Sequence, residues 1–367
     1  MAINMPIKFK PRYQITNKIA SALIKLEGLK ERIKYLPMTP SVLAHLRETA
    51  KLFSTHYSTK IEGNRLSEKD VEGVLTQHRH VPGRERDENE VKGYYKALEE
   101  VERLATEKIV ITEKQIQTIH ANVMRAGRSA TVPTPYRDGQ NIIKDSTTGS
   151  IVYMPPEAKD VPELMTALVS WLTTMDGEIP APIRAAIAHY QFATIHPYYD
   201  GNGRTARLLT TLILHVGGYD LKGIYSLEEY YARDLQAYYD ALTVGPSHNY
   251  YMGREKADIT GWLEYFINGM VDAFEKVQVQ AKAAGDNAED DASPMLRQLG
   301  PRQRKALTLF VRQELIASID IAKLFNFAPR TARALLGQWV KNGFLVVADP
   351  SKKARKYKLA KKFSSLF

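Results

Sequence analysis

The sequence predicts a mainly α-helical protein that has one short β-hairpin and a separate C-terminal module. Apolar residues recur at helical spacing along most of the 367-residue chain. One segment, 127–156, instead combines short β-type runs with many turn residues. The stretch 283–294 is small and acidic without apolar periodicity, and the chain after it is strongly basic. These observations indicate a helical body, a linker over 283–300 and a terminal domain over 301–367.

The first long helix of the predicted body is marked at both ends. Thr39 and Pro40 suit the N-cap and the first helical position, and Gly63 can adopt the left-handed conformation that ends a helix. We therefore expect this helix to run to Glu62. It is the main element of the predicted N-terminal helical region, residues 1–110.

The rest of the helical body follows from the same kind of pattern. Ser67 and Asp70 indicate a capping box at the start of the next helix. The runs Asn141–Lys144 and Ile151–Tyr153 flank the turn sequence DSTTG and predict the β-hairpin. Residues 111–282 are expected to form the core with the helices that follow. Further helices are expected over 87–105, from Thr112, and over 161–174, 183–195, 202–216, 227–242 and 258–281.

The composition is that of a protein from a reducing, aqueous compartment. Apolar residues make up 44% and charged residues 25%, which is usual for globular proteins. The chain has no cysteine, so disulfides and thiolate metal sites are excluded. The N-terminus has early charges and no apolar signal core, and the most apolar stretch, 208–219, is shorter than the roughly 20 residues that span a membrane. We expect a cytoplasmic protein without membrane contact.

The net charge of +10 comes from the C-terminal domain. Residues 301–367 contain 15 lysines and arginines against 3 acidic residues. Within them, 318–343 has helix-turn-helix spacing and two short strands follow, so that the whole resembles a winged helix. This charge suits nucleic-acid phosphate, which makes DNA an expected partner, with docking of another protein as the alternative. The predicted wing carries Lys352, Lys353, Arg355, Lys356 and Lys358.

The segment HPYYDGNGRTAR, His196 to Arg207, places a polar cluster between two apolar helices. Gly201 and Gly203 allow a ligand to approach the backbone where the unpaired N–H groups of a helix N-terminus favour an anion. Arg204 and Arg207 are three residues apart and therefore share one helix face. Two guanidinium groups beside such N–H donors predict a cradle for two or three phosphates.

The residues before this cradle complete a candidate active site. Asp200 would be a misplaced negative charge unless a Mg²⁺ ion bridges it to phosphate oxygens. His196, four residues earlier, is in a position to act as a base on an incoming nucleophile. A phosphate cradle, a metal ligand and a base together predict phosphoryl or nucleotidyl transfer. Each feature alone has a plainer explanation, such as a tight turn or a packed histidine, and only their combination is specific.

This segment resembles the signature of the Fic family, H-x-F-x-[DE]-G-N-G-R-x-x-R, at every polar and glycine position. The one departure is Tyr198 in place of phenylalanine, and a tyrosine there needs a partner for its hydroxyl group. Most Fic proteins transfer AMP from ATP to a protein hydroxyl group. The resemblance therefore implies this activity and a Fic-type helical core. It also implies that the hairpin near 141–153 is the flap that docks the target by strand addition.

The resemblance implies a role for each signature residue. His196 would deprotonate the target hydroxyl group, and Asp200 would hold Mg²⁺ on the α- and β-phosphates. Asn202 would line the anion hole with the backbone of the glycine on either side. Arg204 would stabilise charge during transfer, and Arg207 would bind the γ-phosphate.

Two further features depend on the same resemblance. Tyr238 and Tyr239 correspond to positions that often line the adenine pocket, with plain helix packing as the alternative. The motif STKIEGN resembles the inhibitory motif of the Fic class whose inhibitory helix is N-terminal. In it, Glu62 can pair with Arg207 and occupy the space of the γ-phosphate, and Ser58 helps to fix the glutamate.

The prediction is an autoinhibited protein adenylyltransferase that uses ATP and Mg²⁺. Its target is a serine, threonine or tyrosine hydroxyl group of another protein or of the chain itself, and a homodimer is considered as its assembly. Three alternatives stay open. The chain is a DNA-binding regulator whose Fic core only senses nucleotide, or an enzyme that transfers another phosphate-containing group, or one that removes AMP with the help of Glu62.

Overall fold

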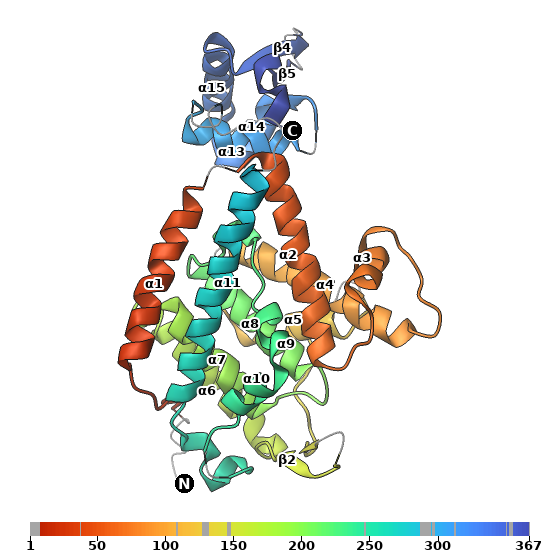
Figure 1. The fold of residues 1–367 in the computed structure, drawn as a ribbon, viewed down its shortest axis with the longest axis vertical. Coiled ribbons are helices and arrows are strands. Elements are labelled where there is room, and N and C mark those ends of the chain that lie inside the picture. The colour runs from red at the N-terminus through yellow and green to blue at the C-terminus, as the bar shows by residue number, and fades with distance from the viewer. Residues whose placement is uncertain are drawn as a thin grey trace. The chain divides into compact units, whose positions relative to one another are not determined.

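The computed structural model describes residues 8–36, 38–107, 109–126, 132–144, 148–245, 247–286, 295, 298–311, 313–349, 351 and 355–366. The chain divides into two compact units. The first consists of residues 1–32 and 49–276, and the second of residues 33–48 and 277–367. Both are built mainly from helices, so the predicted fold class is confirmed (Figure 1). No described helix combines the length and the apolar content that crossing a membrane requires.

The first helix, α1 (Asn17–Lys34), is one that the sequence reasoning did not predict. Thr16 caps it, because its Oγ1 accepts the backbone N–H of Ile19 at 3.2 Å. Lysines and glutamates separate its apolar residues, which nevertheless recur three and four positions apart on one face. The signal for an amphipathic helix was therefore present. The buried residues on that face include Ile19, Ala22, Leu26 and Leu29.

The long helix predicted to end at Glu62 is α2 (Pro40–Ile61), and Gly63 follows it with a φ of 92°. Its last turns bury an unusual number of polar side chains. Two of them fix this helix in one orientation, because Ser54 Oγ donates to Glu228 and Ser58 Oγ accepts from Arg207 Nε. Thr55 Oγ1 has no hydrogen-bond partner among the described residues. The buried polar residues of these turns are Ser54, Thr55, His56, Ser58 and Thr59.

The other predicted helices are present, and one of them is broken. The capping box expected at Ser67 is formed, and Thr112 is the N-cap of the helix that was expected to start there. The single helix predicted over 227–242 is wrong, because the chain leaves the helical conformation at Asp234 (φ −137°, ψ 83°), whose side chain caps a new helix. The helices are α3 (Glu68–Thr76), α4 (Glu85–Thr106), α5 (Glu113–Val123), α6 (Val161–Thr174), α9 (Glu228–Arg233), α10 (Leu235–Leu242) and α11 (Thr260–Asp286).

Two helices form the centre of the first unit (Figure 1). α7 (Ala181–Ile195) is buried along almost its whole length, as its nearly continuous apolar sequence requires. α8 (Asn202–Val216) packs along α7, and α4 and α5 cover α8 from the other side. The predicted active-site segment is the short connection between these two central helices. Its position is therefore set by the best-packed part of the unit.

The predicted hairpin consists of β1 (Ile143–Lys144) and β2 (Ile151–Tyr153), which pair antiparallel. Its base is tied to the central helices, because Tyr153 Oη donates to the carbonyl oxygen of Thr194 in α7 at 2.8 Å. Residues 145–147, which the sequence assigns to the turn, lie outside the described residues. Short 3₁₀ turns occur at Ala158–Asp160, Leu221–Gly223, Tyr250–Met252, Arg254–Lys256 and Lys361–Leu366.

The second unit has its own core and a small antiparallel sheet in the order β3–β5–β4. Trp339 and Phe344 pack edge to face at the centre of that core (5.3 Å between ring centroids). Of the predicted wing residues, Lys352 and Lys353 lie outside the described residues. The elements are α13 (Pro301–Phe310), β3 (Ile316–Ala317), α14 (Ser318–Phe325), α15 (Pro329–Lys341), β4 (Leu345–Asp349) and β5 (Lys356–Leu359).

Candidate active site

His196 is the first residue after α7 and has a left-handed backbone conformation (φ 52°, ψ 59°). This conformation is strained for a residue with a side chain, by roughly 1 kcal/mol, and here it turns the chain sharply out of the helix. His196 Nδ1 lies 3.3 Å from the carbonyl oxygen of Ala193. With the proton assigned to Nδ1, Nε2 keeps its lone pair. Burial lowers the pKa of His196 to about 4, so the imidazole is neutral at neutral pH and able to accept a proton.

The turn after His196 is closed by its own polar groups. Gly201 has a φ of 76°, and a Cβ atom there would lie 2.9 Å from Met124 Sδ, so only glycine fits. Asn202 Oδ1 accepts the backbone N–H of Tyr198 at 2.9 Å, and its Nδ2 donates to the carbonyl oxygen of Tyr198 at 2.8 Å. The Asn202 side chain therefore holds the loop together, which leaves the backbone of the α8 N-terminus to receive an anion.

Arg207 is buried in the first unit, with its guanidinium group held by α2. Its Nε donates to Ser58 Oγ at 2.7 Å, and its Nη2 donates to the Ser58 carbonyl oxygen at 2.9 Å. Nη2 also lies 2.8 Å from Glu62 Oε1. Burial works to lower the pKa of Arg207, and the Glu62 carboxylate with nearby tyrosines outweighs it, so the pKa is raised overall. The predicted partners Ser58, Glu62 and Arg207 are thus brought together.

The Glu62 carboxylate lies in the predicted phosphate cradle itself. A Cβ atom on Gly203 would collide with Glu62 Oε1, and it would lie 3.3 Å from Arg207 Nη1. The carboxylate therefore lies directly against the bare backbone of the first turn of α8. An anionic group already uses the close approach that Gly203 permits. Because Glu62 is 32% exposed while Arg207 is buried, the carboxylate is reached from the outside and the guanidinium group lies behind it.

Asp200 lies at the outer side of the same turn and contacts the buried Arg204. Asp200 Oδ1 accepts the backbone N–H of Gly201 at 2.6 Å and lies 3.2 Å from Arg204 Nη2. The Asp200 side chain is 58% exposed, and the described residues provide no partner for its Oδ2. No group of three or more histidine and acidic side chains in the described ranges is arranged to enclose a metal ion. One exposed carboxylate fits Mg²⁺, which commonly binds through one or two carboxylates, waters and substrate phosphates.

The expected partner for the hydroxyl group of Tyr198 is not found, so this expectation is wrong. The hydroxyl group is buried and makes no hydrogen bond with any described residue. The ring is fixed by stacking on His120, with ring centroids 3.6 Å apart and planes 15° apart. His120 in turn holds the loop, because its Nε2 lies 2.8 Å from the carbonyl oxygen of Asp200. Ring packing, which phenylalanine would supply equally, decides this position.

The two tyrosines considered for the adenine pocket differ in environment. Tyr238 is buried in an aromatic cluster, and its hydroxyl group lies 2.9 Å from His189 Nε2. Tyr239 is 43% exposed, and it donates to the carbonyl oxygen of Ile61 at the end of α2, at 3.3 Å. Only Tyr239 offers a ring face to a ligand in this conformation. Contact of either residue with adenine stays a prediction.

Sequence reasoning missed the segment that lies against the His196 loop from the hairpin side. Arg137 donates from its backbone N–H to the carbonyl oxygen of Pro197, and from Nε to that of His196, both at 2.9 Å. Asn141 Nδ2 donates to the carbonyl oxygen of Tyr198 at 3.2 Å. These bonds recognise backbone carbonyl groups, which leave no pattern in a sequence. The only available signal was a charged residue inside the turn-rich sequence YRDGQN.

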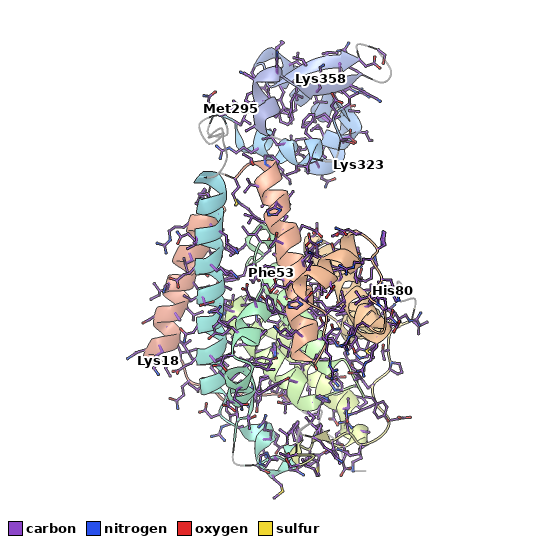
Figure 2. All side chains as sticks on the ribbon, turned by 45° about the vertical axis from the view of Figure 1, so that its right-hand side comes forward. Lys18, Phe53, His80, Met295, Lys323 and Lys358 are labelled. Carbon is purple, nitrogen blue, oxygen red and sulfur yellow. The ribbon has the colours of Figure 1, made fainter. Side chains whose placement is uncertain are left out.

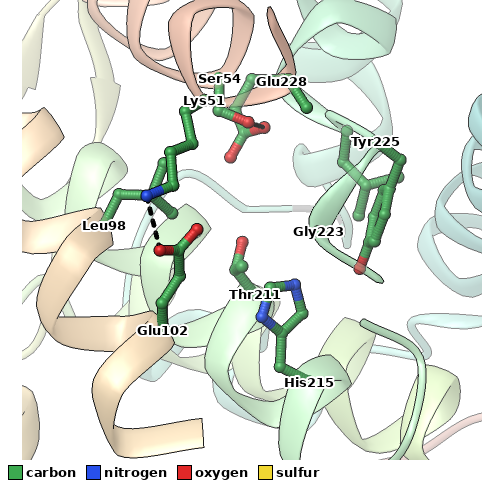
Figure 3. Close-up of a pocket in the computed structure, with 11 residues that line it drawn as sticks. Lys51, Ser54, Leu98, Glu102, Thr211, His215, Gly223, Tyr225 and Glu228 are labelled. Atoms are coloured by element: carbon green, nitrogen blue, oxygen red, sulfur yellow. Dashed lines mark hydrogen bonds and ion pairs between the residues drawn. The ribbon is translucent and has the colours of Figure 1, made fainter. Parts of the chain in front are cut away.

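A pocket separate from the cradle lies beside α2 (Figure 3). Glu228, which is buried there, accepts Ser54 Oγ of α2 at 2.9 Å and Tyr94 Oη of α4 at 3.0 Å. Lys51 of α2 pairs with Glu102 of α4 at 2.6 Å. These contacts fix α2 one and two turns before Ser58. The lining residues are Ala50, Lys51, Ser54, Leu98, Glu102, Thr211, His215, Gly223, Tyr225, Leu227 and Glu228.

Comparison with known sequences gives a consistent result for this region. Residues 110–214 match the Fic/DOC family. A relative named protein adenylyltransferase Fic, from Nematostella vectensis, is 30% identical over 207 residues, which are 54% of this chain and 45% of the relative. A relative of the same name from Drosophila virilis is 30% identical over 199 residues and is covered over 39% of its length. The chain thus spans less than half the length of these curated relatives.

Solved structures agree on the fold. A Fic family protein from Desulfovibrio desulfuricans superimposes with a TM-score of 0.60 at 23% identity, covering 96% of this chain and 99% of the other. A Fic domain containing signaling protein from Bacteroides thetaiotaomicron gives a TM-score of 0.58 at 24% identity, covering 73% of this chain and 97% of the other. With the signature loop, the central helices and the sequence match in agreement, the chain carries a Fic domain over residues 110–214.

Proposed function

We propose that this protein transfers AMP from ATP to a hydroxyl group of a protein, and that Glu62 restrains the reaction. The observation that carries the proposal is the carboxylate of Glu62 against Gly203 and Arg207. An anion in that position supports a cradle built for anions, since the N-terminus of α8 and a buried guanidinium group both favour negative charge. The relatives named protein adenylyltransferase Fic support ATP as the substrate and a protein as the target.

The chemistry proposed for this loop is a single displacement at phosphorus. The hydroxyl oxygen of the target forms a bond to the α-phosphorus of ATP while the bond to pyrophosphate breaks. The proton of the hydroxyl group passes to Nε2 of His196, which is neutral because burial lowers its pKa to about 4. Orientation of the two reactants by the rigid connection between α7 and α8 supplies the remaining acceleration.

Charge stabilisation falls to the residues around the α8 N-terminus. Arg204 is buried, with one guanidinium nitrogen directed to Asp200, so it is held beside the phosphates that enter. Mg²⁺ bound to ATP would be held through Asp200 and would neutralise phosphate charge. Arg207 would bind the γ-phosphate once Glu62 leaves it. These groups act on charge that develops during transfer, which is where preorganised donors are most effective.

The proposed function is tested with the full-length chain, labelled ATP and Mg²⁺. Wild type, Glu62→Gly and His196→Ala are incubated with a bacterial or animal protein extract, and modified peptides are identified by mass spectrometry. We expect added AMP with Glu62→Gly, less with wild type and none with His196→Ala. Absence of AMP from every sample in the presence of bound ATP would overturn the proposal and favour the nucleotide-sensing alternative. Loss of AMP from a pre-modified target would instead favour AMP removal.

A second function is proposed for the C-terminal unit, as a winged helix that binds duplex DNA. The order α13, β3, α14, α15, β4, β5 and the three-stranded sheet support this reading. Every described lysine and arginine from residue 301 onward is exposed, and none of them forms an ion pair within the described part of the unit. Lys323 and Lys358 lie at its surface (Figure 2). Phosphate backbone contacts use such unpaired cations.

The homodimer considered above stays a prediction.

A further inference from the structure

Arg137 holds three separate pieces of backbone with one buried side chain. Nε donates to the His196 carbonyl oxygen at 2.9 Å, Nη1 to that of Gly139 at 3.0 Å, and Nη2 to that of Pro156 at 2.5 Å. Gly139 precedes the hairpin strand β1, and Pro156 follows β2. The guanidinium group therefore fastens both arms of the hairpin to the residue that bears the proposed base.

The same neighbourhood offers Arg137 no counter-ion. The side chain is buried, and it forms no ion pair with any described residue. A buried guanidinium group without a carboxylate costs several kcal/mol of desolvation, and hydrogen bonds to carbonyl oxygens offset only part of that cost. Leucine or methionine would avoid this cost but would leave three carbonyl oxygens without their donor. The guanidinium group is therefore explained by the bonds that it makes to both arms of the hairpin and to His196.

Neighbouring residues strengthen the same connection. Asn141 Nδ2 donates to the Tyr198 carbonyl oxygen at 3.2 Å, and Tyr199 Oη donates to Asp138 Oδ1 at 2.6 Å. The segment Arg137–Asn141 thus lies along the loop from His196 to Tyr199 and contacts each of its residues through a polar bond, since Arg137 N also binds the Pro197 carbonyl oxygen. The left-handed backbone of His196 needs such support, because its strain must be offset by surrounding contacts.

We propose that Arg137 is the positioning residue of the active-site loop, which holds the His196 backbone in its strained conformation and keeps a positive charge beside the imidazole. The inference rests on the proposed function, because it assigns Arg137 to the same reaction. It adds a residue outside the signature segment. It also means that Arg137 connects the base rigidly to the hairpin that borders it.

The electrostatic part follows from the charged groups near His196. Burial is the main cause that lowers the pKa of its imidazole, and the positive charge of Arg137 acts in the same direction. The carboxylates of Glu62 and Asp200 act in the opposite direction. Removing the charge of Arg137 should therefore raise the pKa of His196 and make part of the base protonated at a higher pH.

The test compares Arg137→Gln, which loses the charge, with Arg137→Lys, which keeps it but cannot reach three carbonyl groups. Arg184→Gln is the control, because Arg184 is also buried and binds a carbonyl oxygen, that of Ile179, near the start of α7, and differs in having an ion pair with Asp176. All are made in full-length Glu62→Gly protein. We measure kcat over pH, ATP affinity by calorimetry, and the titration of His196 by NMR with labelled histidine.

We expect kcat to fall about 10- to 100-fold in both Arg137 variants with ATP affinity changed less than twofold, because a small displacement of the base affects the transition state more than nucleotide binding. The His196 titration should move upward in Arg137→Gln only. An unchanged titration and an unchanged kcat in folded Arg137→Gln would overturn the inference. The NMR titration needs no turnover, so it still decides the matter if the parent transfers no AMP and the proposed function fails.

Discussion

Glu62 Oε1 lies 2.8 Å from Arg207 Nη2, although the two residues are 145 positions apart in the chain. The contact joins the last turn of α2 to the first turns of α8. It gives a buried guanidinium group the carboxylate that its desolvation requires. Any other anion that uses Arg207 must therefore displace Glu62, and this competition leads to the first prediction.

Replacement of Glu62 by glycine should raise AMP transfer at least tenfold and tighten ATP binding, because the competing carboxylate is gone. Arg207→Ala should weaken ATP use, and it should also remove the gain from Glu62→Gly, since the two residues act as a coupled pair. Initial rates of the wild type, both single variants and the double variant measure this. Lys60→Gly, in the same helical turn but exposed, controls for loss of the helix end. A gain with Lys60→Gly equal to that with Glu62→Gly would refute the competition.

The rate of transfer should stay nearly constant from pH 8 to about pH 5.5. An exposed histidine loses its basic form below pH 6.5, whereas burial lowers the pKa of His196 to about 4. The acidic limb of kcat/KM therefore belongs near pH 4, below which the rate falls tenfold for each pH unit. His196→Ala should abolish transfer and leave ATP binding intact. A limb between pH 6 and 7 in the wild type would contradict the burial of the base.

Stability should fall in mild acid because four buried histidines are neutral. Burial lowers the pKa of His120, His196 and His215 to about 4 and that of His189 to about 3. Below pH 6.5 the unfolded chain therefore binds about four protons that the folded chain does not bind. Stability is full above pH 6.5, and it falls by about 5 kcal/mol per pH unit between roughly pH 6 and 5. Urea unfolding at several pH values measures the slope, and His189→Gln should remove about a quarter of it.

Tyr198→Phe should stabilise the protein by about 1 kcal/mol, since it removes a buried hydroxyl group that has no partner among the described residues. The ring would still stack on His120, so activity should be kept. Tyr153→Phe is the opposing control, because that hydroxyl group donates to the Thr194 carbonyl oxygen at 2.8 Å and its loss should lower stability by a similar amount. The melting temperatures of both variants in thermal unfolding measure these changes in stability. A lower melting temperature for Tyr198→Phe would indicate a partner for the hydroxyl group.

The full-length protein should bind a DNA duplex of about 20 base pairs, with an affinity that falls steeply as the salt concentration rises. Arg330 and Arg333 are exposed in the first turns of α15, so their joint replacement by glutamate should weaken binding at least tenfold. Lys18 and Lys25 are exposed on α1 in the first unit, and their joint replacement by glutamate should leave binding unchanged. Fluorescence anisotropy at several salt concentrations measures this. If both double replacements weakened DNA binding equally, the binding would depend on net charge alone and not on α15.

The parts of the fold that the sequence predicted are those with local causes. The capping box at Ser67, the N-cap at Thr112 and the turn at Gly201 depend on residues within a few positions, so spacing alone revealed them. The break at Asp234 was missed because apolar periodicity continues across it. A single aspartate cap outweighed that periodicity.

The candidate site shows the same division. The loop from His196 to Arg207 is contiguous, and its chemistry was readable from residue types. Its long-range partners were readable only where a motif marked them, as for Glu62. Arg137 and His120 bind carbonyl oxygens of the loop, and a carbonyl group is common to all residues. Such contacts depend on the tertiary fold, and no sequence spacing predicts them.

The burial of Ser54, Thr55, His56, Ser58 and Thr59 in α2 has a consequence for kinetics. Because these residues are buried, α2 can move away from α8 only by local unfolding, which takes microseconds to seconds. The partly exposed side chain of Glu62 can instead rotate within nanoseconds. Glu62 is thus a tethered competitor whose effective concentration, on the order of millimolar, is set by the chain and not by the cell. An anion that binds Arg207 therefore competes with the same effective concentration of Glu62 whatever the concentration of the protein.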